Sequence, residues 1–173
     1  APVKVGHLAR RFLGSLSPRR LAATEAEWVE GLLDPPEREL WARTGRADRR
    51  HVVGVARRVE ATLGDEATRP VLAAALLHDI GKLESGLGTY GRVIATLSIA
   101  VAGRDVAAAW CETGGFTRRV GLYARHEELG ADLLALAGSD PLTVALVREQ
   151  SVPVDERSVP DHLIEALTAA DDG

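Results

Sequence analysis

The sequence predicts an all-α fold, a helical bundle of 173 residues. Apolar residues recur at helical spacing through most of the chain, and proline and glycine divide it into segments of helical length. We find no stretch in which apolar and polar residues alternate as in a half-buried strand. We expect an N-terminal helical extension, residues 1–45, packed on a main domain of residues 46–173.

The composition is that of one soluble globular domain, with 46% hydrophobic and 27% charged residues. A net charge of −4 gives no electrostatic case for binding a nucleic acid duplex. No apolar run approaches the ~20 residues that span a bilayer, and the start lacks a secretory apolar core. The single cysteine, Cys111, excludes an internal disulfide and fits a reducing compartment. We therefore expect a cytoplasmic protein with no membrane partner, and a homodimer is left open.

Two short signals mark the helices of the extension. Ser17-Pro18 and Asp34-Pro35 each place a capping side chain before a proline at the first helical position. They predict helices running to about Leu33 and about Thr44, with the first broken or restarted near Thr24.

The main domain is expected to begin with two helices that form its core. Asp48 predicts the start of the first and Gly64 its end. The second spans Thr68–Ile80 and is apolar on every side, which is typical of a buried helix. The first helix has an apolar stripe at helical spacing: Val52, Val55, Ala56 and Val59.

The rest of the chain is also predicted to be helical, with two loops. Residues 83–91 contain three glycines without periodicity, and residues 151–160 form the second loop. The predicted helices are 92–102, 104–112, one from about 117, 126–138, 140–151 and 160–171.

The most informative residues end the apolar helix. His78 and Asp79 follow seven apolar residues, and leaving either group unpaired there would cost several kcal/mol. A metal ion accepts neutral imidazole and ionised carboxylate together, and so compensates their burial. His51 is in register with its own helix's apolar stripe, so we expect its ring to face the same interior. Asp171 ends another apolar run, although Asp172 is a rival for its role.

At this point the chain resembles a known family. His51, the doublet His78-Asp79 within "LLHDIGK" and Asp171 within "ALTAADD" are similar to the H…HD…D signature of HD-domain metal-dependent phosphohydrolases. The resemblance covers about residues 51–171. It implies an HD-domain helical bundle in which these four residues hold a divalent ion such as Mn, Fe, Co, Ni or Mg. The implied activity is hydrolysis of a phosphate ester in a nucleotide or another small phosphorylated metabolite.

Some subgroups of that family add histidines that recruit a second ion. His126 matches the first of these added positions, but it is also compatible with a surface residue beside a helix start. Where the next histidine would be expected the chain has Gln150, and an amide is a much poorer transition-metal ligand than imidazole. We therefore expect one ion, with a second weak or absent.

Two residues are candidates for a catalytic role in that reaction. Asp79 is a metal ligand that could also accept a proton. Lys82 lies four residues after His78 and could neutralise a phosphate oxygen, although a lysine there also suits a helix C-terminus. The arginines at 49, 50, 92, 118, 119 and 125 are candidates to bind the rest of an anionic substrate.

Two other functions remain open. The first is a catalytically silent HD domain that binds a nucleotide or a protein partner and acts as a regulator, which the glutamine at position 150 favours. A di-iron oxygenase on the same scaffold ranks last, because it needs more histidines than this chain offers.

Overall fold

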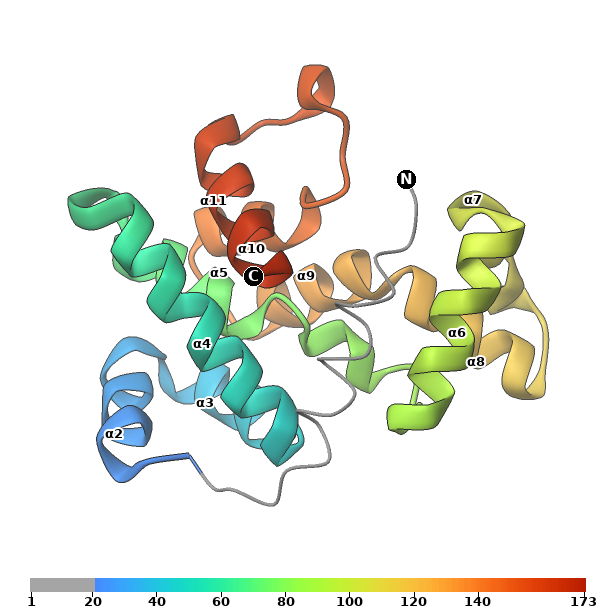
Figure 1. The fold of residues 1–173 in the computed structure, drawn as a ribbon, viewed down its shortest axis with the longest axis horizontal. Coiled ribbons are helices and arrows are strands. Elements are labelled where there is room, and N and C mark those ends of the chain that lie inside the picture. Colours follow the sequence, from blue (N-terminus) through green and yellow to red (C-terminus); the bar gives the residue numbers. More distant parts are fainter. Residues whose placement is uncertain (1–20) are drawn as a thin grey trace.

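The computed structural model describes residues 21–173, and the predicted capping pair Ser17-Pro18 lies outside them. Across this range the chain is helical and contains no strand, so the all-α prediction is confirmed (Figure 1). The helices are α2 (Ala23–Leu32), α3 (Pro35–Ala42), α4 (Arg46–Leu63), α5 (Arg69–Leu77), α6 (Thr89–Ala102), α7 (Arg104–Ala109), α8 (Gly115–Ala124), α9 (His126–Leu136), α10 (Pro141–Arg148) and α11 (Asp161–Asp172). Short 3₁₀ turns are η1 (Gly64–Glu66), η2 (Ile80–Leu83), η3 (Trp110–Glu112) and η4 (Val154–Glu156).

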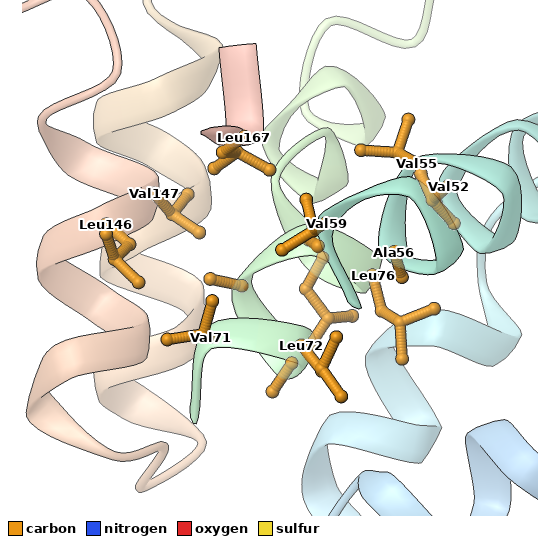
Figure 2. Close-up of a cluster of buried hydrophobic side chains, with 14 of the residues drawn as sticks. Val52, Val55, Ala56, Val59, Val71, Leu72, Leu76, Leu146, Val147 and Leu167 are labelled. Atoms are coloured by element: carbon orange, nitrogen blue, oxygen red, sulfur yellow. The ribbon is translucent and has the colours of Figure 1, made fainter. Parts of the chain in front are cut away.

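The core is built around α5, whose residues from Val71 to Leu77 are all buried. α5 packs against α4 on one side and α10 on the other, and α11 packs against α4. Figure 2 shows the side chains of α4, α5, α10 and α11 meeting in this cluster. Burial on every side explains why α5 lacks the polar face of an ordinary surface helix.

The predicted N-terminal extension contributes to the same core. Val29, Leu33 and Leu40 belong to the main apolar cluster, so residues from both predicted parts share one interior. The cap predicted at Asp34 is confirmed: it precedes Pro35, and its backbone N–H donates to the carboxylate of Glu37 at 2.9 Å.

Several predicted boundaries were wrong. The cap of α4 is Gly45, and Asp48 instead lies in the first turn, where both of its oxygens accept from Arg92. The apolar helix ends at Leu77 and continues after Asp79 as the 3₁₀ turn η2. α10 ends at Arg148. For Asp48 the ionic partner lies on α6, which local sequence does not reveal.

The middle of the chain departs further from prediction. The loop predicted over 83–91 gives way to α6 at Thr89, and α8 begins at Gly115. The predicted helix over 104–112 divides into α7 and η3. α6, α7 and α8 pack on one another at one end of the molecule, around a small cluster of Leu87, Ala95 and Val120 (Figure 1). Among the described residues, no helix combines the length and the apolar character needed to cross a membrane.

Candidate metal centre

Three segments far apart in the sequence meet beside the core. His51 lies in the second turn of α4, His78 and Asp79 directly follow α5, and Asp171 lies in the last turn of α11. α4 packs against both α5 and α11, which brings the ends of those two helices onto His51. The four residues predicted as metal ligands therefore lie together.

The distances between their polar atoms are short. His51 Nε2 lies 2.6 Å from Asp171 Oδ1. His78 Nε2 lies 3.4 Å from Asp79 Oδ1 and 3.5 Å from Asp171 Oδ1. One ligand atom from each of His51, His78 and Asp79 falls within 4.8 Å of the others. Two ligands held about 2.1 Å from one ion lie roughly 3–4 Å apart, so the two separations from His78 Nε2 fit shared coordination, whereas His51 and Asp171 lie at direct hydrogen-bond distance.

His78 presents an unsatisfied nitrogen to this cluster. Its side chain is 2% exposed, and Nδ1 donates to the carbonyl of Ala75 at 2.9 Å, one of the carbonyls left over at the end of α5. This bond fixes the neutral tautomer with its lone pair on Nε2. Nε2 is buried and has no hydrogen-bond partner among the described residues. Leaving this nitrogen unsatisfied destabilises the fold by about 1–3 kcal/mol, unless a cation or a proton binds to it.

The charges around His78 favour a positive species at that nitrogen. Burial is the largest influence and lowers the pKa of His78, but the carboxylates of Asp79 and Asp171 outweigh it. The net result is a raised pKa. The two carboxylates thus create a site that attracts either a proton or a metal cation.

Asp79 divides its two oxygens between different partners. Oδ1 faces His78, whereas Oδ2 accepts from Lys82 Nζ at 2.6 Å. Lys82 is 8% exposed, and this pairing compensates the burial of both charges. Lys82 therefore positions the Asp79 carboxylate; its contact with a substrate phosphate stays a prediction.

His126 lies on the other side of Asp79, at the start of α9. Its Nε2 is 4.0 Å from Asp79 Oδ1 and 4.0 Å from Glu127 Oε1. Its Nδ1 donates to the carbonyl of Tyr123 at 2.8 Å, so the same tautomer logic leaves Nε2 with a lone pair. Burial and the neighbouring Lys82 ammonium lower the pKa of His126 to about 4, which keeps the ring neutral near pH 7.

Sequence reasoning missed two residues that shape this region. Gly81 does not have a positive φ; instead, a Cβ there would lie 1.9 Å from the carbonyl oxygen of His126. The absent side chain lets α9 approach η2 and places His126 beside Asp79. Glu127 is held by Ser151 and Arg104 at 2.8 Å each. The only sequence signals were the glycine after "HDI" and the second acid after His126.

The remaining candidates are largely engaged elsewhere. Gln150 Nε2 donates to the carbonyl of Val147 at 3.1 Å, three residues back, as His78 and His126 do through Nδ1. Four of the predicted substrate arginines are bonded to backbone carbonyls or carboxylates of the protein. Arg49 binds the carbonyls of Ala42 and Thr44, Arg92 binds Asp48, Arg119 binds the carbonyls of Ser85 and Gly86, and Arg125 binds Glu128.

Comparisons with protein-family models, with curated proteins and with solved structures gave no match for this chain. The case for a function therefore depends on the site itself.

Proposed function

We propose that this chain is a metal-dependent phosphohydrolase of the HD-domain type, acting on a nucleotide or another small phosphorylated metabolite. The observation that carries the proposal is the buried Nε2 of His78. It lacks a hydrogen-bond partner and lies within 3.5 Å of two carboxylates, with His51 bound to one of them. A divalent cation satisfies all four groups at once, which a proton shared between two of them does not.

The residues present suit such an ion. Two neutral imidazoles and two carboxylates form a mixed donor set that binds Mn, Fe, Co or Ni, with Mg served by the oxygens. The chemistry that a divalent ion supplies at such a site is a lowered pKa of its bound water and polarisation of a phosphoryl group. His51, His78, Asp79 and Asp171 would hold it.

The protein's own contributions follow from the contacts around Asp79. Lys82 holds Oδ2 and so directs Oδ1 toward His78 and His126. His126 stays neutral near pH 7, so the lone pair on its Nε2 can bind a second ion weakly. The Lys82 ammonium also adds positive charge beside the site, which favours an anionic substrate.

A second function is favoured by Gln150. Where the family resemblance would place another metal-binding histidine, the amide is engaged with the carbonyl of Val147. A site with an incomplete ligand set is consistent with a regulator that binds a nucleotide or a protein partner without hydrolysis.

Metal analysis of Asp79→Asn tests the ligand assignment. The change keeps the shape of the side chain but removes its charge, so we expect bound metal to fall at least tenfold relative to the parent. Asp132→Asn is the matched control, since Asp132 pairs with Arg148 on the surface of α9. Equal metal content in all three proteins would overturn the assignment of Asp79.

Hydrolysis assays separate the enzyme from the regulator. The parent protein would be loaded with Mn(II), Co(II), Ni(II) or Mg(II) and given a general phosphodiester, a phosphomonoester and a nucleotide panel. We expect turnover that Asp79→Asn abolishes and Asp132→Asn retains. Metal retention without turnover on any substrate supports the regulator instead.

A further inference from the structure

The unit formed by α6, α7 and α8 exposes most of the large apolar side chains on the described surface. Of the eight that are exposed in residues 21–173, six lie in this unit: Tyr90, Ile94, Leu97, Val101, Val106 and Phe116. The apolar cluster inside this unit is small: its buried members are Leu87, Ala95 and Val120. Apolar surface concentrated in this way marks an interaction site rather than the scattered exposure of ordinary surfaces.

Four of these side chains form a row along α6. Tyr90, Ile94, Leu97 and Val101 are separated by four, three and four residues, which places them within about 60° of one another around the helix. They are 70%, 51%, 52% and 90% exposed. We call them the α6 seam. The opposite face packs into the protein through Ala95 and Ile99, so the seam points away from the core.

The spacing is that of alternate d and a positions in a coiled coil, and it reads the same in both directions along the helix. Two antiparallel copies of α6 therefore place Tyr90 opposite Val101 and Ile94 opposite Leu97, and the same two pairs recur on the other side of the two-fold axis. Antiparallel pairing also aligns the helix dipoles favourably.

Charge decides among the possible occupants. Arg92 is the only charged residue of α6, and its guanidinium is bound to Asp48 on the side away from the seam. A membrane-surface helix needs basic residues flanking its apolar face, and the net charge of −4 opposes an anionic surface. A seam without charge suits an identical copy, because it brings no like-charge repulsion and displays no charge pattern that would select a different partner.

We propose that this protein forms a two-fold symmetric homodimer through antiparallel pairing of α6. α6 lies beside α7 and α8, at the end of the molecule opposite α2 and α3 (Figure 1). A single helix pair buries less area than a standard protein interface, so the dimer is reversible and depends on protein concentration. This inference does not depend on the proposed hydrolase activity.

Sedimentation velocity of the full chain tests the proposal, over concentrations that bracket micromolar to submillimolar dissociation constants. We expect the parent to shift from monomer to dimer as concentration rises. Leu97→Glu should weaken dimerisation by about tenfold or more, because each dimer would bury two unpaired carboxylates. Leu136→Glu is the matched control: Leu136 is 87% exposed on α9, so this variant should dimerise like the parent.

Both substituted side chains are exposed, so the helix content measured by circular dichroism should not change. A parent that stays monomeric over the whole range overturns the proposal, as does a Leu97→Glu variant that dimerises like the parent. Binding of a monomeric parent to phosphatidylcholine–phosphatidylserine vesicles, lost in Leu97→Glu, would assign the seam to a membrane and also overturn it.

Discussion

Substitution of Gly81 by alanine should disrupt the approach of α9 to η2. A Cβ at this position would lie 1.9 Å from the carbonyl oxygen of His126, 2.6 Å from the nitrogen of Gly130 and 2.8 Å from the carbonyl carbon of His126. All three neighbours are backbone atoms, so no side-chain rotamer change relieves the contact. The start of α9 would have to withdraw by about 1 Å to reach even a tight contact.

The expected cost follows from that geometry. Overpacking of a dense interior costs typically 1–3 kcal/mol, and a methyl group forced against backbone on one helix start lies at the upper end, about 3 kcal/mol. For a chain of this size each kcal/mol changes the melting temperature by about 2–4 °C. We therefore expect Gly81→Ala to melt about 6–12 °C below the parent, as followed by circular dichroism.

Gly31→Ala provides the matched control. Gly31 lies within α2, and no atom lies within 4 Å of a Cβ added there. Alanine in an open helical position should stabilise by about 0.5–1 kcal/mol, so this variant should melt slightly above the parent. If the melting temperatures of Gly81→Ala and Gly31→Ala differ by less than about 2 °C, the close approach of η2 and α9 is wrong.

Three further predictions concern other contacts. Burial raises the pKa of Glu149, but the hydrogen bonds donated by Ser158 outweigh burial, and the net pKa is lowered. The ionised Glu149 carboxylate therefore stabilises the fold above pH 4.5, and this stabilisation is lost as the pH falls through the lowered pKa. Glu149→Gln should flatten that part of the curve of unfolding free energy against pH, measured by urea denaturation. Gln150→His should raise the metal-to-protein ratio, since an imidazole can keep the bond to the carbonyl three residues back and leave Nε2 free to bind; an unchanged ratio counts against a latent second site. Arg92→Ala should cost about 1–2 kcal/mol in thermal unfolding, because it removes a charged hydrogen bond to Asp48 that joins α6 to α4; an unshifted melting curve would contradict this.

Helical periodicity predicted the class of fold because it depends on residues three and four apart, which the sequence displays directly. The apolar run before His78 predicted a buried helix, and the structure buries every residue from Val71 to Leu77. Boundaries were predicted less well. Asp48 has the chemistry of a cap, yet it pairs with Arg92 from a helix forty-four residues away, a competition that local sequence does not contain.

The candidate ligands were also chosen from the sequence, but only as types of residue at particular helix ends. Their proximity depends on how α4, α5 and α11 pack, which places His51 and Asp171 2.6 Å apart across 120 residues. The pairing of Lys82 with Asp79, and the contact of Asp171 with His51, likewise required coordinates.

The sequence by itself determined that this protein is helical, which helix is buried and which residues could bind a cation. Those properties follow from the spacing and chemistry of neighbouring side chains. Tertiary structure decided that the candidate ligands lie together, that Gly81 lets α9 approach them, and that α6 presents an apolar seam outward. These depend on contacts between distant segments, and such contacts are fixed only when the whole core packs.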